Sequence, residues 1–92
     1  MNNEELIRNV LTKLCQDNFK TDYKILSKQM GEKNDSFGDG LRNFVAKLYS
    51  AKRYSLKGSE FLGAIYSFFA YDKPLDTEKL QRYLSDNNKG ER

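Results

Sequence analysis

The sequence predicts an all-α fold, a compact bundle of about five short helices. Apolar residues recur along most of the chain at intervals of three and four residues, which is the period of a helix with one buried face. Capping and turn residues separate these runs, and no segment shows the alternation typical of a strand. Because 92 residues suffice for one core, we expect a single helical domain over residues 1–85, followed by a disordered polar tail over residues 86–92.

The first predicted helix has the clearest periodicity. Asn3 is the expected N-cap, and Glu4 and Glu5 occupy the first turn, where the helix dipole favours negative charge. Asp17 and Asn18 are expected to end this helix. The apolar stripe that should face the core consists of Leu6, Ile7, Val10, Leu11, Leu14 and Cys15.

The second predicted helix is short and covers residues 22–30, with Thr21 as its N-cap. One flank is basic, because lysines recur every four residues at positions 20, 24 and 28. Gly31 stands where a glycine commonly ends a helix. The polar residues 32–40 predict a loop whose one large apolar residue is Phe37. The residues expected to face the core are Ile25, Leu26 and Met30.

The third predicted helix covers residues 40–51. The fourth begins after Ser55 or Ser59 and ends near residue 70. This fourth helix is apolar nearly all round, so we expect it either at the centre of the core or shared with a second chain. The inner stripe of the third helix is Leu41, Phe44, Val45 and Leu48.

The fifth predicted helix lies beyond Pro74, the only proline of the chain. Asp76 is its expected N-cap. Leu75 and Leu80 occupy the two positions of a hydrophobic staple, which fixes the entry of the chain into a helix. Tyr83 continues the inner face of this helix.

The composition argues against catalysis. The chain has one cysteine and no histidine, so Ser/His and Cys/His nucleophile pairs cannot form. Histidine is also the commonest general base and metal ligand. Cys15 lies on the apolar face of the first helix and is interpreted as a small buried hydrophobe. We therefore expect a protein that is not an enzyme and that has no cofactor and no metal.

No segment has the features of a membrane span or of a signal peptide. The longest apolar stretch, residues 61–71, is too short to cross a bilayer and is interrupted by Gly63 and Ser67. The N-terminus is acidic and polar, without the basic start and apolar block of a signal peptide. We expect a cytoplasmic protein with no membrane partner.

Positive charge is concentrated in one part of the sequence. The formal net charge is +3, a value that is also common for solubility alone. Between Asp39 and Glu60, however, the sequence has no acidic residue. This distribution favours contact with DNA phosphates. The basic residues of the stretch are Arg42, Lys47, Lys52, Arg53 and Lys57.

Two segments resemble the helix-turn-helix of the lambda-repressor-like DNA-binding regulators. In residues 26–31, an apolar residue and the small Ser27 precede the turn glycine Gly31, as they do in that family. Residues 41–48 resemble its recognition helix, and the elements that follow come in the same order, so the resemblance covers roughly residues 3–85. The turn departs from the pattern, because nine residues separate Gly31 from Leu41, whereas the family's turn normally has about three or four.

The resemblance implies a small transcriptional regulator that binds double-stranded DNA, of the sort found in phages and mobile elements. Arg42, Asn43 and Lys47 would share the exposed face of the recognition helix, where arginine suits guanine and asparagine suits adenine. The residues expected to contact phosphates are Lys28, Lys52, Arg53 and Lys57, with a further hydrogen bond from Tyr54 or Ser55.

Other interpretations fit the same sequence. The basic face can be an ordinary solvated helix surface, or the chain can be a non-catalytic protein-interaction module, such as a small inhibitor or adaptor. Many helix-turn-helix proteins are dimers, so a homodimer closed by Tyr66, Phe69 and Tyr71 is a further prediction. The anchors expected for a partner protein are Phe37, Tyr49, Tyr54 and Tyr71.

Overall fold

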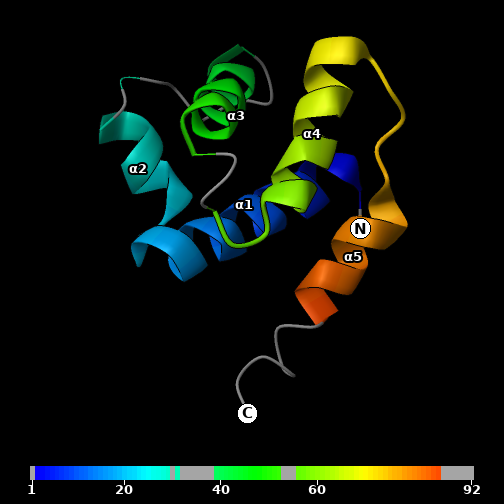
Figure 1. The fold of residues 1–92 in the computed structure, drawn as a ribbon, viewed down its shortest axis with the longest axis horizontal. Coiled ribbons are helices and arrows are strands. Elements are labelled where there is room, and N and C mark those ends of the chain that lie inside the picture. The colour runs from blue at the N-terminus through cyan, green and yellow to red at the C-terminus, as the bar shows by residue number, and fades with distance from the viewer. Residues whose placement is uncertain (1, 30, 32–38, 53–55, 86–92) are drawn as a thin grey trace.

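Helices make up most of the chain that the computed structural model describes, which covers residues 2–29, 31, 39–52 and 56–85, with the backbone alone at positions 39, 51 and 52. The five helices of these residues are α1 (Asn3–Phe19), α2 (Tyr23–Gln29), α3 (Asp39–Lys52), α4 (Ser59–Tyr71) and α5 (Thr77–Ser85). No strand occurs within these ranges, and the Cα radius of gyration of 12.3 Å is that of a compact chain of this length. The predicted all-α bundle is confirmed (Figure 1).

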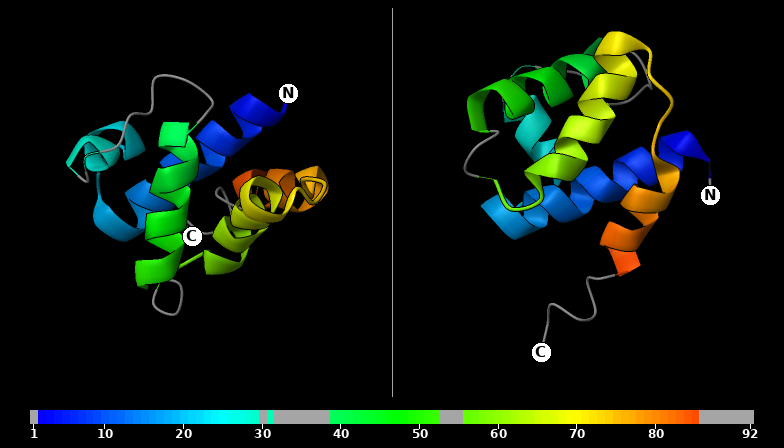
Figure 2. Two further views of the ribbon diagram at one scale, coloured as in Figure 1. Left: turned by 90° about the horizontal axis from the view of Figure 1, so that it is seen from above. Right: turned by 45° about the vertical axis from the view of Figure 1, so that its right-hand side comes forward.

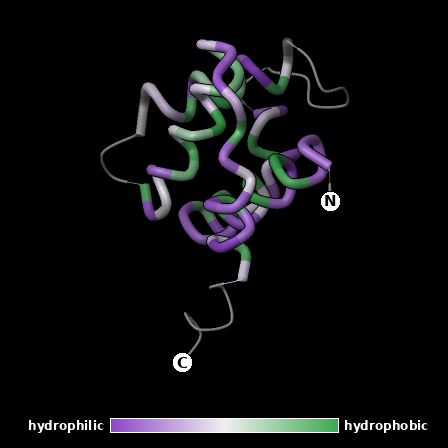
Figure 3. The backbone as a smooth tube through the Cα atoms, turned by 90° about the vertical axis from the view of Figure 1, so that its right-hand side faces the viewer, coloured by the Kyte–Doolittle hydropathy of each residue, from purple (hydrophilic) through white to green (hydrophobic). Residues whose placement is uncertain are grey.

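α1 is the element against which most of the other helices pack. α2, α4 and α5 contact it directly, whereas α3 packs chiefly on α4. α3 and α4 lie on one side of α1, and α5 lies on the other (Figures 1 and 2). Hydrophobic and hydrophilic residues succeed one another along the helices (Figure 3). The predicted stripe of α1 is confirmed, because all its members are buried: Leu6, Ile7, Val10, Leu11, Leu14 and Cys15.

The ends of α1 and α2 differ by one or two residues from the prediction. Asn2, rather than Asn3, caps α1, and its side-chain oxygen accepts a hydrogen bond of 2.8 Å from the amide three residues further on. α1 continues past its predicted end to Phe19. Asp22, rather than Thr21, caps α2 and accepts a hydrogen bond of 2.9 Å from the amide two residues further on. Neighbouring residues of these types cap helices about equally well, so the sequence pattern locates a helix start only approximately.

The prediction that Ile25 faces the core is wrong. The buried residues of α2 are Tyr23 and Ser27, and Ile25 stands two positions from each, about 200° around the helix. Its side chain is consequently 54% exposed. Leu26 is partly buried against the core, and Met30 lies outside the described residues. A helix of seven residues has about two turns, so its apolar residues did not define a face.

The inner stripe predicted for the third helix is confirmed. Leu41, Phe44, Val45 and Leu48 of α3 are all buried. Of the loop predicted over residues 32–40, positions 39 and 40 belong to α3. Residues 32–38, with Phe37, lie outside the described residues, as does the predicted tail over residues 86–92.

α4 begins at a close contact that only glycine fits. Gly58 occupies the N-cap position, where the sequence pattern predicts a serine, and it has a φ of 84°. A Cβ atom at Gly58 would stand 2.8 Å from Cδ2 of Leu14. The preceding residue is also fixed, because the Asn18 side chain accepts a hydrogen bond of 2.8 Å from the Lys57 amide and donates one of 3.0 Å to the Lys57 carbonyl. The start of α4 is therefore held on the end of α1.

The predicted start of α5 is confirmed. Asp76 accepts a hydrogen bond of 3.1 Å from the Lys79 amide and so caps the helix. Leu80 is fully buried and Leu75 is packed partly buried against the core, as a hydrophobic staple requires.

Tyr83 joins α5 to both α1 and α4. Its hydroxyl donates a hydrogen bond of 3.2 Å to Asp17 Oδ2, and its ring stacks on Phe61 with 4.3 Å between the centroids. The Lys13 ammonium lies 3.6 Å from the centroid of the same ring. Burial, together with the negative charge of Asp17, raises the pKa of Tyr83 well above its ordinary value, so the hydroxyl keeps its proton and remains a donor.

Replacing Leu11 with Ala is expected to lower the free energy of unfolding by about 2–5 kcal/mol, because the lost methyl groups leave a cavity on the buried face of α1. Chemical denaturation measures this change. Gln16→Ala, on the exposed side of the same helix, is the matched control and should change it by less than about 0.5 kcal/mol. A neutral Leu11→Ala would mean that α1 packs through a different face.

Tyr83→Phe removes the hydrogen bond to Asp17 but keeps the ring, so we expect a loss of about 0.5–1.5 kcal/mol near neutral pH. The folded state raises the pKa of Tyr83 above 10.0. The contribution of the Tyr83 hydroxyl to the free energy of unfolding is therefore complete below about pH 10 and declines as the pH rises further. Urea denaturation of both proteins at neutral and alkaline pH tests this. A difference in stability that does not shrink above about pH 10 would contradict the raised pKa.

Candidate nucleic-acid interface

The outer face of α3 carries polar side chains, and over residues 40–50, whose side chains the structure describes, this face has no carboxylate. Its members follow the period of a helix, so they share one side. The small Ala46 lies half-buried among them. Asp39, the first residue of α3 and the only acidic one, stands three and four positions before Arg42 and Asn43 and is in register with this face, and its side chain lies outside the described residues. The exposed residues of the α3 outer face are Arg42, Asn43, Lys47 and Ser50. The face therefore presents guanidinium, amide and ammonium donors.

The opposite face of α3 fixes the rotation of the helix about its axis. The four apolar residues of the inner stripe are buried. The ring of Phe44 lies 6.2 Å from that of Tyr23 on α2, measured between centroids. Tyr49 stacks on Tyr66 of α4 at 4.8 Å. Because α3 is held from two sides, its outer face keeps one orientation relative to the core.

The residues predicted to contact phosphates are only partly described. Lys28 is exposed in the last turn of α2, and Lys57 is exposed in the turn before α4. Lys52 is the last residue of α3, but its side chain lies outside the described part, as do Arg53 and Tyr54. The structure thus brings together the three residues predicted on the outer face of α3. That the other five predicted residues lie beside these three stays a prediction. They are Lys28, Lys52, Arg53, Tyr54 and Lys57.

Charge is divided unevenly along the chain. Residues 20–57 contain nine Lys or Arg residues and four Asp or Glu residues, a net charge of +5, whereas the remainder has a net charge of −2. The positive part of the sequence includes all of α2 and α3. An uneven distribution of this kind attracts polyanions to one side of a protein.

The arrangement of α2 and α3 does not reproduce a short helix-turn-helix connection. Nine residues, 30–38, join the two helices, and of these only Gly31 is described. Gly31 has the positive φ of 80° that is predicted for a glycine at the end of a helix, and its amide donates to the Lys28 carbonyl at 3.0 Å. α3 packs chiefly against α4. The helix-turn-helix core therefore stays a prediction.

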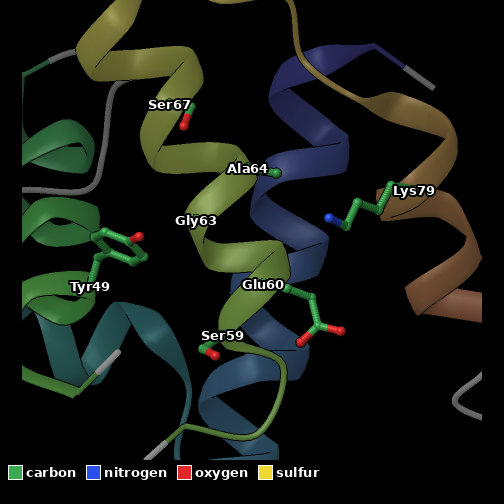
Figure 4. A pocket seen from close by; sticks show the side chains of 7 residues that line it. All are labelled: Tyr49, Ser59, Glu60, Gly63, Ala64, Ser67 and Lys79. Atoms are coloured by element: carbon green, nitrogen blue, oxygen red, sulfur yellow. The ribbon is translucent and has the colours of Figure 1, made fainter. Parts of the chain in front are cut away.

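A shallow groove on the outer side of α4 was not predicted from the sequence. It has a volume of about 490 Å³, with α3 on one bank and α5 on the other (Figure 4). The sequence signal that could have found it is the recurrence of small residues every four positions along α4, at Ser59, Gly63 and Ser67. The residues that line the α4 groove are Tyr49, Ser59, Glu60, Gly63, Ala64, Ser67 and Lys79.

Comparisons of the chain with protein-family models, with curated proteins and with solved structures found no match. The described residues contain no group of three or more His, Cys, Asp or Glu side chains placed to hold a metal ion. Within the same residues, no helix is both long and apolar enough to cross a membrane.

Cys15 has the environment of a packing residue. Its side chain is 0% exposed. Burial, with a smaller effect of the Asp22 charge, raises the pKa of the Cys15 thiol to about 12. The thiolate is the reactive form, and at pH 8 a pKa of about 12 leaves roughly one thiol in ten thousand ionised.

We therefore expect the native protein to react with a thiol-specific disulfide reagent at pH 8 at least about a hundredfold more slowly than the protein in denaturant. The absorbance of the released thiol gives both rates, and Cys15→Ser supplies the blank. Equal rates in the two states would show that Cys15 is accessible in the folded protein.

Proposed function

We propose that this protein is a small DNA-binding transcriptional regulator whose α3 outer face enters the major groove of double-stranded DNA. The observation that supports it is the outer face of α3 beyond the first residue of the helix, which exposes Arg42, Asn43 and Lys47 without a carboxylate on a helix whose opposite side is buried. A solvated surface helix usually mixes charges of both signs, whereas residues 40–50 of this helix have only positive and neutral groups.

The dimensions and chemistry of α3 suit the major groove. The groove admits one α-helix, and recognition helices read base edges mainly with residues near their N-terminus. Arg42 and Asn43 are the fourth and fifth residues of the 14-residue α3. Arginine pairs in bidentate fashion with guanine, and asparagine does so with adenine. Ala46, one turn further on, is small enough to let the helix approach the bases.

The phosphate contacts are assigned to exposed lysines of the positively charged part of the chain. Lys47 lies on the same face, and Lys28 and Lys57 are exposed on the segments that precede α3 and α4. Each phosphate that a lysine neutralises releases counterions, so binding should weaken steeply with salt. The net charge of +5 over residues 20–57 supports this assignment.

The two groups of residues are expected to respond differently to mutation. Arg42→Ala or Asn43→Ala should cost about 1–3 kcal/mol on a preferred duplex and relax base preference. Lys28→Ala or Lys57→Ala should weaken binding to every duplex and lower the salt slope by about one unit. The measurement is binding to a duplex selected from a random library and to a scrambled duplex, across a salt series.

Arg82→Ala is the matched control, since Arg82 is an exposed arginine of α5, on the other side of α1 from α3 (Figure 1). It removes the same charge and should leave affinity and salt slope nearly unchanged. Absence of binding to any duplex at about 50 mM salt, where phosphate contacts are strongest, would reject the regulator. If the alanine variants at positions 28, 42, 43 and 57 all lost the same affinity for the selected and the scrambled duplex, Arg42 and Asn43 would contact phosphates rather than bases.

The alternative function is a non-catalytic protein-interaction module. The observation that favours it is exposed aromatic surface, because Tyr71 is 63% exposed and Tyr49 lines the α4 groove. Aromatic residues dominate the binding energy of protein interfaces. This alternative becomes the leading one if the protein binds no duplex.

A further inference from the structure

Most apolar residues of α4 are half-buried at the edge of the core rather than fully buried. Its 13 residues include a single charged residue, Glu60. Only Leu62 and Ile65 are fully buried, whereas α1, which is far more polar, buries six residues. A helix that is apolar on nearly all sides is normally covered on nearly all sides, so the outward side of α4 is a candidate for an interface.

The α4 groove occupies this outward side. Its floor contains Ser59, Gly63 and Ser67, which are four residues apart and so follow one line along the helix. Tyr49 forms the α3 bank, and a Cβ atom at Gly63 would stand 3.3 Å from the Tyr49 ring. Lys79 projects from the α5 bank (Figure 4). Small residues in such a line allow a second helix to approach closely.

Aromatic contacts hold one bank of the groove in shape. The Tyr49 ring stacks on Tyr66 at 4.8 Å, and Tyr66 meets Tyr71 edge-on at 5.9 Å. Tyr71 continues the line of Ser59, Gly63 and Ser67 by four more residues and is 63% exposed. Tyr49, the ring that lines the groove, is therefore already packed on Tyr66, so a partner would not have to order it.

We propose that the α4 groove is a homodimer interface, in which α4 crosses α4 of a second copy in an antiparallel orientation. The charges of the groove select this occupant. Its charged lining residues are Glu60 and Lys79, and both side chains lie on the α5 side of the groove (Figure 4).

An antiparallel pairing about a twofold axis reverses the direction of α4 but brings the α5 sides of the two copies together. Glu60 of each copy then faces Lys79 of the partner subunit, and the pair occurs twice because a twofold interface is self-complementary. The remaining lining is uncharged, so no like charges are opposed. This inference does not depend on DNA binding.

The test is the mass of the full chain in solution without DNA, measured by sedimentation equilibrium over a range of protein concentrations. We expect a reversible dimer. Glu60→Lys and Lys79→Glu should each raise the dimer Kd by about tenfold or more, because each places like charges together at two symmetric positions. The double exchange, Glu60→Lys with Lys79→Glu, restores opposite charges and should bring Kd back to within about threefold of the original.

The controls make the same charge changes outside the groove. Glu78→Lys and Lys73→Glu alter exposed residues that do not line it, and they should leave the Kd nearly unchanged. Ser67→Arg fills the floor and should abolish the dimer, with circular dichroism verifying that each variant is folded.

A monomer at every concentration would overturn the proposal. So would a dimer that Ser67→Arg leaves intact, since the interface would then lie elsewhere. Single exchanges that weaken the dimer without rescue by the double exchange would overturn the antiparallel pairing of Glu60 with Lys79. Failure of the DNA assay alone would leave these results unchanged, so the two proposals are separable.

Discussion

The burial of one face of α1 is the interaction on which the rest of the structure depends. That face is a single apolar stripe of six residues, and α2, α4 and α5 all pack against this helix. Polar contacts then fix the positions of these helices along α1. Asn18 holds the backbone of Lys57 just before α4, and Tyr83 ties α5 to Asp17. A small domain has one core and little reserve of stability. The positions of the α3 outer face and of the α4 groove therefore depend on the stripe of α1, although α1 forms neither surface.

α3 is positioned indirectly, and this matters for the candidate site. It rests chiefly on α4, which rests in turn on α1, and the stack of Tyr49 on Tyr66 lies at this junction. Tyr49 of this pair also lines one bank of the α4 groove. The α3 outer face and the α4 groove are therefore separate surfaces with different chemistry, supported by shared contacts. The first is polar and cationic, and the second is lined by small residues with one Glu and one Lys. A ligand that ordered one surface would also stabilise contacts that support the other.

Periodicity predicts those parts of this fold that a single helix determines. The buried stripes of α1 and α3 follow from spacing alone, and the α3 outer face follows as the complement of its stripe. The prediction failed where a helix is too short to define a face and where the outcome depends on the distance between elements. Ile25 was misplaced because the two turns of α2 contain too few apolar residues to define a face. Gly58, rather than a serine, precedes α4 because Leu14 stands where a Cβ atom would lie, and only the assembled fold shows that contact. The α4 groove was missed for the same reason, since the exposure of α4 depends on how far apart α3 and α5 lie.

The two proposed interfaces would reinforce each other if both exist. One copy offers few phosphate contacts, and salt weakens each of them. A single copy is therefore expected to bind DNA weakly. A dimer doubles those contacts on one duplex, and the second copy binds at a high effective concentration once the first is bound. Twofold symmetry in the protein also matches the symmetry of paired DNA half-sites. Linkage makes the effect reciprocal, because any factor by which dimerisation strengthens DNA binding is the factor by which DNA strengthens the dimer. The ion pairs between Glu60 and Lys79 across the α4 groove would then contribute to DNA affinity without contacting DNA.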